Sequence, residues 1–254
     1  MEPKDAFNHT MARVESMLKL FDLLCNQRRK AIRQDWARKF KVLMHWNQGE
    51  TIYRVDGNGA VIILRESANI TDQSFCEDEL SELLRAALVM AVSALDRYCH
   101  ELVTSKIIGE LKKPEDHIAS ELRKMEIPLI KAVEAIRHAR KPDSRPMNMV
   151  KAILQDKIHR NFTLQKAGDI EQALHMVGIN QLWTSCGTTM GEKPEQIKRK
   201  LNSIVRRRDS IVHEGDLVKH RKGGSLTLNP IKFQVIHRDI DWIKKLVEAI
   251  DAAS

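Results

Sequence analysis

The uncharged stretch AALVMAVSAL, residues 86–95, decides the fold of this chain. It lies in the middle of residues 77–111, whose pattern predicts one long helix. Because the ten central residues are apolar nearly all round, we expect this helix to be the buried central member of a helical bundle.

The composition of the whole chain supports a helical architecture. Its 254 residues are 43% apolar and 30% charged, which is typical of a globular protein. The 11 glycines and 7 prolines are too few for the frequent turns of an all-β fold. We therefore expect an all-α antiparallel bundle.

Several classes of protein are excluded by what the sequence lacks. No run of about 18 apolar residues is present, so we expect no membrane span. The first ten residues, MEPKDAFNHT, lack the apolar segment of a secretory signal. The four cysteines are scattered and fit no zinc or thioredoxin spacing. We interpret the chain as cytoplasmic, with no structural metal and no cofactor.

Two elements are predicted before the long helix. Residues 7–24 have apolar side chains at three- and four-residue steps, which predicts an amphipathic helix. Residues 51–64 hold two β-rich runs around an Asp-Gly-Asn-Gly turn, which predicts a small β-hairpin. Such a hairpin is marginally stable alone, so we expect it to decorate the helical body. Residues 28–41 are mainly basic, and residues 67–76 are expected to form a linker.

Further helices are predicted after the long one. In chain order they are a stretch at 115–140 interrupted by Pro128, a helix from Met149 after a loop at 142–146, a short helix at 168–183 that ends near Gly178, and a closing helix at 239–252. A loop around Gly187 and Gly191 is also expected. We predict a single domain over residues 1–254, with a core at 77–217 between an N-terminal decoration and a C-terminal basic loop with its closing helix.

The positive charge is concentrated in one short region. The chain carries 42 Lys and Arg against 34 Asp and Glu, a formal net charge of +8. Ten of the basic and four of the acidic residues lie in residues 193–222, which gives this region a net charge of +6. This excess favours a polyanionic partner such as nucleic acid, and a solvated helix face with a solubilising loop is the alternative. The rest of the chain is close to neutral, and we interpret it as scaffold.

An arginine interrupts the apolar stripe of the helix that begins near Pro194. The stripe consists of Ile197, Leu201, Ile204 and Ile211, and Arg208 occupies its fourth position in chain order. A buried guanidinium is costly unless it is paired, so we expect Arg208 to meet a carboxylate, a phosphate or a partner chain.

A histidine and an acid accompany this arginine. His213 is expected in the last helical turn, because Gly215 is a plausible helix terminator. Asp209 lies four residues before His213 and can orient its imidazole. A fixed cation, a titratable imidazole and an orienting acid are what metal-free RNA cleavage requires. The alternative is that His213 only interacts with the helix dipole.

Two charged residues on the long helix are further candidates for the site. Arg85 and Asp96 bracket the apolar stretch, almost three turns apart, so they point to the same side at about 16 Å along the axis. We expect them to support the site, and the alternative is that each pairs with a neighbour at the edge of the bundle.

Residues 207–216, RRDSIVHEGD, resemble the Arg-(polar)-x3-His signature of HEPN domains. The resemblance continues in other segments. Residues 83–89 and 91–98 are similar to the first core helix of the RiboL-PSP-HEPN group, and residues 170–183 resemble its approach to the catalytic helix. Together these matches extend from about residue 77 to residue 217.

This resemblance implies an all-α bundle and a metal-independent endoribonuclease of toxin or antiphage-defence type. It implies that Arg208 and His213 are the signature residues, with Asp209 at the polar position, and that two copies form a homodimer with a composite active site. The products would be 2′,3′-cyclic phosphate and 5′-hydroxyl ends. An antitoxin or other regulatory partner is expected, because uncontrolled cleavage is toxic. The alternative is a non-catalytic HEPN module that binds RNA or nucleotide or mediates assembly.

Basic side chains near the signature are the candidate RNA-binding residues. They are Arg206, Arg207, Lys219, Arg221 and Lys222. The last three belong to a glycine-containing loop that is well placed to follow a phosphate backbone.

Overall fold

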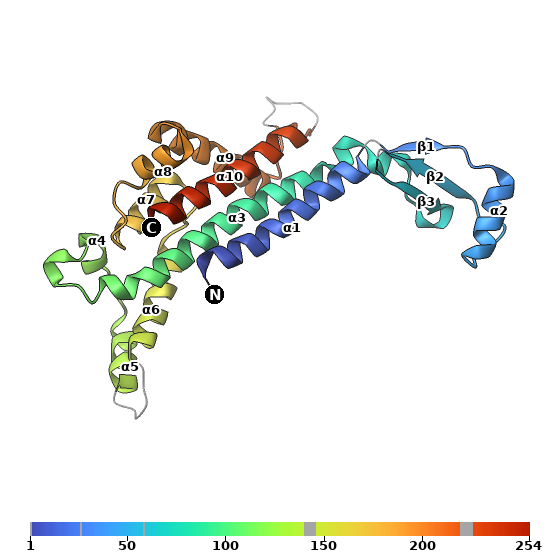
Figure 1. Cartoon of the computed structure of the whole chain (residues 1–254). Helices are drawn as coiled ribbons and strands as arrows, with labels where there is room; N and C mark the ends of the chain where they lie inside the picture. The colour runs from blue at the N-terminus through green and yellow to red at the C-terminus, as the bar shows by residue number, and fades with distance from the viewer. Residues whose placement is uncertain (1, 26, 58, 140–145, 219–225) are drawn as a thin grey trace. The chain divides into compact units, whose positions relative to one another are not determined.

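The computed structural model describes residues 2–25, 27–57, 59–139, 146–218 and 226–254 (Figure 1). The architecture is all-α with one small antiparallel sheet, as predicted. The chain folds into two compact units. Unit 1 holds Met1–Ala12, Val89–Asn229 and Arg238–Ser254, and unit 2 holds Arg13–Leu88 and Pro230–His237. The prediction of a single domain stays a prediction.

Three long helices contribute residues to unit 1. They are α1 (Pro3–Leu24), α3 (Glu77–Glu110) and α10 (Phe233–Ala253), which run side by side in Figure 1. The ring of Phe7 in α1 meets the ring of Tyr98 in α3 edge-on, with centroids 6.1 Å apart. The Tyr98 hydroxyl donates to Asp251 of α10 at 3.1 Å. The predicted central helix is therefore confirmed, and most of its apolar stretch is buried.

Three further helices complete the core of unit 1. They are α7 (Ala167–His175), α8 (Leu182–Met190) and α9 (Pro194–Glu214), with α9 in contact with both others. The predicted loop around Gly187 and Gly191 is wrong at Gly187, which lies inside α8, and right at Gly191, which follows the last residue of that helix. A Cβ atom at Gly187 would lie 2.7 Å from the carbonyl oxygen of Glu192. Glycine is needed there because the chain turns back closely against α8, and the actual break comes at Gly191, with a φ of 68°.

The region between α3 and α7 consists of short helical segments. They are η3 (Glu115–His117), α4 (Ser120–Arg123), α5 (Leu129–Ala139) and α6 (Pro146–Asn161). The helical stretch interrupted at Pro128 is thus confirmed in outline. The predicted loop at 142–146 falls mostly on residues outside those described. Helix α6 begins at Pro146, three residues before the predicted start, because proline is well tolerated at a first helical position.

Unit 2 contains the sheet. The predicted hairpin is confirmed as β2 (Ile52–Asp56) and β3 (Val61–Arg65), which pair antiparallel with Asp56 opposite Val61. A third strand, β1 (Arg28–Lys30), pairs with β2 and gives the order β1-β2-β3. Helix α2 (Gln34–Leu43) lies between β1 and β2 in the chain, and η1 (Glu66–Ala68) and η2 (Asp72–Phe75) lead to α3. The sequence prediction missed β1 and α2.

Among the residues described, no helix is both long and apolar enough to cross a membrane.

The closing helix α10 begins at Phe233, six residues earlier than predicted. Its first residues belong to unit 2, where Phe233 stacks on Phe21 of α1 with centroids 5.5 Å apart.

Candidate active site

Helix α9 carries the three central residues of the predicted site. At its start, the backbone N–H of Lys193 donates to the side-chain oxygen of Gln196 at 3.1 Å. At its end, Gly215 takes a left-handed conformation with a φ of 62°, which glycine adopts at little cost. Both ends agree with the prediction, and His213 lies in the last turn.

The beginning of α9 is buried and its end is not. Ile197, Leu201 and Ile204 are each at most 2% exposed, as the apolar stripe predicts. Further along, Ile211 is half-buried and Val212 is 45% exposed. Arg208 lies between these two parts, so it stands at the border of the core.

The guanidinium of Arg208 is only partly satisfied. Its side chain is 17% exposed, and Nη1 donates to Oδ1 of Asp209 at 3.0 Å. Its Nε is buried and has no hydrogen-bond partner among the residues described. Leaving a buried donor without a partner costs about 1–3 kcal/mol. Arg208 therefore meets a carboxylate, one of the three partners inferred from its place in the stripe, and its Nε remains without a partner among the described residues.

His213 is exposed, and Asp209 is paired with Arg208. Within the described part of the chain, no hydrogen bond or ion pair joins Asp209 to His213. The structure thus places the three predicted residues on the last two turns of one helix. Asp209, however, pairs with Arg208 and not with His213. An orienting role of Asp209 toward His213 stays a prediction.

Arg207 has a function that the sequence prediction missed. Its Nη1 and Nη2 donate to the two carboxylate oxygens of Asp216, the second pair at 2.8 Å. Asp216 is 1% exposed and has a φ of 56°. Its carbonyl accepts from the backbone N–H of Asn229 at 2.8 Å and from the Asn229 side chain at 3.0 Å. We call Arg207, Asp216 and Asn229 the clasp.

The clasp fixes the chain immediately after the signature. Beyond Asp216, Leu217 pairs with Leu228, and the N–H of Val218 donates to the carbonyl of Thr227 at 2.8 Å. These contacts hold together the two chain segments on either side of residues 219–225. The guanidinium of Arg207, which was predicted from the sequence to bind RNA, is paired with Asp216, and its RNA-binding role stays a prediction.

The other predicted RNA-binding residues divide into two groups. Arg206 is exposed, as an RNA-binding residue must be. Lys219, Arg221 and Lys222 lie outside the described residues.

Arg85 and Asp96 contact residues of their own helix. Arg85 is 4% exposed and its Nη1 donates to Ser81 and, at 3.1 Å, to Glu82. Arg85 belongs to unit 2, whereas Asp96 belongs to unit 1 with α9. One oxygen of Asp96 lies 3.6 Å from Nε2 of His100. These contacts correspond to the alternative of pairing with neighbours, and a supporting role in the site stays a prediction.

His100 is a buried histidine outside the predicted site. Its ring stacks on that of His159 in α6, with centroids 4.2 Å apart. Burial lowers the pKa of His100, and the neighbouring His159 lowers it further, whereas Asp96 opposes the shift. Within the described part of the chain, no group of three or more His, Cys, Asp or Glu residues is arranged to hold a metal ion.

Comparison with known proteins identifies the family. A family model described as RiboL-PSP-HEPN matches residues 62–253, about three quarters of the chain. No curated protein and no solved structure matches. The matched range includes α3, α9 and α10 and extends beyond residues 77–217, where the resemblance was recognised. The chain belongs to the RiboL-PSP-HEPN family.

Proposed function

We propose that this chain is a metal-independent endoribonuclease that works as a homodimer. The observation that carries the proposal is the buried Nε of Arg208, which has no partner among the described residues and lies on the same helix as the exposed His213. HEPN families generally include ribonucleases, which fits this arrangement. A phosphate oxygen would satisfy the free donor of Arg208.

The reaction needs a base, an acid and a cation. The 2′-oxygen of a ribose attacks the adjacent phosphorus, while a histidine takes the proton of the 2′-hydroxyl. Arg208 stabilises the negative charge of the phosphorane. The bond from phosphorus to the 5′-oxygen then breaks, and a protonated histidine supplies the proton of the leaving oxygen. The products are a 2′,3′-cyclic phosphate and a 5′-hydroxyl.

The helical geometry favours a site built from two copies. His213 lies five positions after Arg208, which corresponds to about 7.5 Å along the axis and a rotation of about 140°. One helix therefore presents the two side chains in different directions. If the ends of two α9 helices meet, each copy supplies one histidine, so that one acts as base and the other as acid.

The biological class follows from the resemblance and from the danger of the reaction. We place the chain among toxin or antiphage-defence effectors that act on RNA in the cytoplasm. Because unrestrained cleavage of RNA would harm the host, an antitoxin or other regulatory partner is expected to control it.

The proposal is tested by incubating purified protein with RNA in an excess of EDTA. We expect cleavage to continue and the 3′ ends to carry 2′,3′-cyclic phosphate, which ligation-based sequencing of the ends detects. Cleavage that stops in EDTA and returns with Mg²⁺, or that leaves 3′-hydroxyl ends, would contradict the proposal.

A second candidate is a non-catalytic HEPN module that binds RNA or nucleotide, or that mediates assembly. The observation that favours it is the pairing of Asp209 with Arg208, because no described contact then joins Asp209 to His213 to orient the imidazole. RNA binding that depends steeply on salt, together with no cleavage at any protein concentration, would support this candidate.

A further inference from the structure

A second concentration of positive charge lies in unit 2, far from the signature in sequence. Residues 28–65 contain nine Lys and Arg against three Asp and Glu, an excess of six. The net charge of the chain outside residues 193–222 is close to zero, because the residues outside both regions carry more acids than bases. This near-zero net charge conceals the excess in residues 28–65. The interpretation of that part of the chain as neutral scaffold is therefore wrong for residues 28–65.

The cations of this region are less neutralised than those of α9. In α9, Lys198 lies 3.2 Å from Glu171, Lys200 pairs with Asp239, and Arg207 pairs with Asp216. In β1 and α2 and between them, Arg29 and five other exposed cations have no carboxylate partner among the described residues. The five others are Arg28, Lys30, Arg33, Arg38 and Lys39. An unneutralised group of this kind attracts a polyanion.

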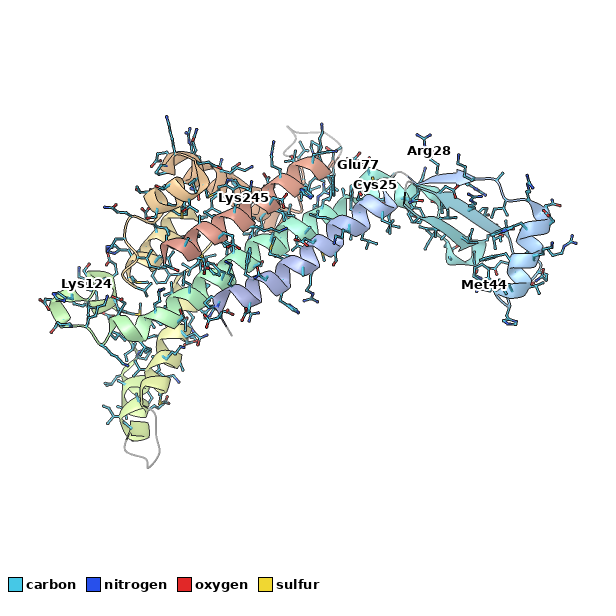
Figure 2. All side chains as sticks on the ribbon, viewed as in Figure 1. Cys25, Arg28, Met44, Glu77, Lys124 and Lys245 are labelled. Carbon is cyan, nitrogen blue, oxygen red and sulfur yellow. The ribbon has the colours of Figure 1, made fainter. Side chains whose placement is uncertain are left out.

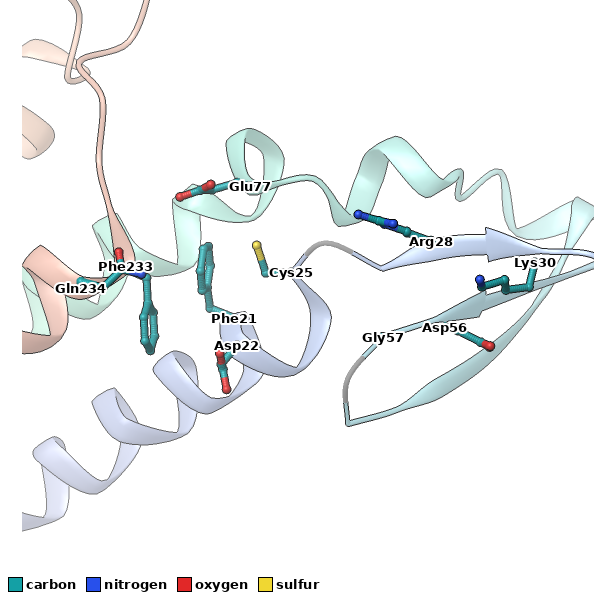
Figure 3. Close-up of a pocket in the computed structure, with 10 residues that line it drawn as sticks. All are labelled: Phe21, Asp22, Cys25, Arg28, Lys30, Asp56, Gly57, Glu77, Phe233 and Gln234. Atoms are coloured by element: carbon teal, nitrogen blue, oxygen red, sulfur yellow. The ribbon is translucent and has the colours of Figure 1, made fainter.

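Strand β1 places its cations on both faces of the sheet, because side chains alternate along a strand. Arg28 and Lys30 line a cavity of about 610 Å³ (Figure 3). Arg29 lies over the ring of Tyr53 on β2, with its guanidinium carbon 3.9 Å from the ring centroid. Arg29 and Tyr53 line a second hollow of about 290 Å³ on the opposite face.

The larger cavity combines cations with hydrogen-bond acceptors. Besides Arg28 and Lys30, it is lined by the carboxylates of Asp22, Asp56 and Glu77, as Figure 3 shows. Its volume falls in the range of about 300–1,000 Å³ that is usual for small-molecule sites. The carboxylates can accept hydrogen bonds from the amino groups of a base, while the cations meet the phosphates on either side.

Helix α2 adds aromatic surface to the cations. Trp36 is 42% exposed and stacks on Phe40 with ring centroids 4.8 Å apart. None of the residues of α2 is buried, and the helix leads to Met44, which is labelled in Figure 2. Exposed aromatic rings beside cations are the features on which unpaired bases stack. Duplex RNA offers no such bases, so the combination fits a single strand.

We propose that β1, α2 and the cavity beside β1 form a binding surface for single-stranded RNA. The proposal deepens the proposed function by assigning a substrate class, and it rests on that function only in taking RNA as the polyanion. The exposed apolar residues Val42 and Leu43 would also suit an anionic membrane, which the test below separates from RNA.

The test uses the full chain carrying His213→Ala, so that bound RNA is not cut. In this background, one variant removes charge from the proposed binding surface by replacing Arg28, Lys30, Arg33, Arg38 and Lys39 with Gln. We call it the module variant. A matched control replaces five other exposed cations that have no carboxylate partner among the described residues, namely Arg13, Lys19, Lys112, Arg123 and Lys166. Both variants lose the same charge, and thermal unfolding checks that both remain folded.

The affinity for a fluorescent oligouridine of about 20 nucleotides is measured between about 50 and 200 mM salt. We expect the module variant to bind at least about tenfold more weakly, and its salt slope to fall by about 0.7 for each lost phosphate contact. The control should bind within about twofold of the parent. Equal losses in both variants, or no loss in the module variant, would overturn the proposal.

Vesicles that contain phosphatidylserine serve as the second probe. If the module variant loses vesicle binding but keeps RNA binding, the surface serves a membrane and the proposal is overturned. The assay contains no cleavage step. A wild-type protein that fails to cut RNA would therefore refute the proposed catalysis. The binding comparison would still show whether this surface binds single-stranded RNA.

Discussion

At the scale of single residues, Arg208 pairs with Asp209 through Nη1, while its buried Nε has no partner among the described residues. Its position in the apolar stripe of α9 was enough to predict from the sequence that this guanidinium needs a partner. Replacing Arg208 with Met keeps the apolar stem and removes the unsatisfied Nε. We expect RNA cleavage to slow by about 10²–10³-fold, because a charge contact in the transition state is lost. The free energy of unfolding in urea should change by less than about 1 kcal/mol, or increase. A loss of several kcal/mol would show that Arg208 is structural.

The clasp predicts a large loss of stability when the neighbouring Arg207 is replaced, in contrast to Arg208. Arg207→Gln leaves the carboxylate of Asp216, which is 1% exposed, without its main partner. We expect a destabilisation of about 3 kcal/mol, because removing one member of a buried ion pair leaves an uncompensated charge. Arg206→Gln is the matched control on the exposed side of the same turn, with an expected change below about 0.5 kcal/mol. Similar unfolding midpoints in urea for the two variants would contradict the structural role of Arg207.

The sequence could not predict the clasp, although it contains all three residues. The pairing of Arg207 with Asp216 depends on a left-handed turn after Gly215 and on the return of the chain to Asn229. These are contacts between residues 9 to 22 positions apart, which no periodic pattern records. The sequence therefore led to a prediction of the signature residues but not of the contacts that hold their turn in place.

At the scale of elements, the sequence predicted those with a strong apolar period. Helices α1, α3 and α9 and the β2-β3 hairpin were found with nearly correct ends. Strand β1 was missed because Arg-Arg-Lys has no apolar residue, and only its pairing with β2 makes it a strand. Helix α8 was missed because Gly187 was interpreted as a loop residue, whereas it permits a close approach of the chain.

Two glycines inside helices provide a matched test of this interpretation. At Gly187 an added Cβ would meet a backbone oxygen at 2.7 Å, so Gly187→Ala should lower the melting temperature despite the better helix propensity of alanine. At Gly109 in α3, no atom that the structure describes beyond the neighbouring backbone lies within 4 Å of the added Cβ. Gly109→Ala should therefore stabilise the protein by about 0.5–1 kcal/mol. Calorimetry of both variants would reject the account if Gly187→Ala were the stabilising one.

At the scale of the whole molecule, stability should depend on pH through His100. Burial lowers its pKa in the folded chain, so the unfolded chain binds more protons below about pH 6.5. Stability from this group is thus present above that pH and is lost as the pH falls. The loss is at most about 1.4 kcal/mol per pH unit for one proton.

Urea unfolding at about pH 7.5 and 5.5 measures this effect in the wild type and in His100→Gln. We expect the variant to lose less stability on acidification than the wild type. Asp96 and His159 are unchanged in both proteins, so the difference isolates His100. An equal or larger loss in the variant would show that His100 is not the group responsible.

Charge is also a property of the whole molecule that the sequence recorded only in part. The net charge of the whole chain pointed to a polyanion, and the excess of positive charge in residues 193–222 drew attention to α9. The structure shows that several cations of α9 are paired with carboxylates, while those of β1 and α2 face no such partner among the described residues. Pairing of this kind joins elements distant in the chain, so counting residues could not reveal it.

The most direct test of the central claim compares His213→Ala with the wild type in an RNA-cleavage assay in EDTA. His9→Ala, which removes an exposed histidine from α1, is the control. We expect His213→Ala to abolish cleavage while its melting temperature stays within about 1 °C of the wild type, because His213 is exposed. His9→Ala should cut RNA at the wild-type rate. Undiminished cleavage by His213→Ala would contradict the assignment of α9 as the catalytic helix.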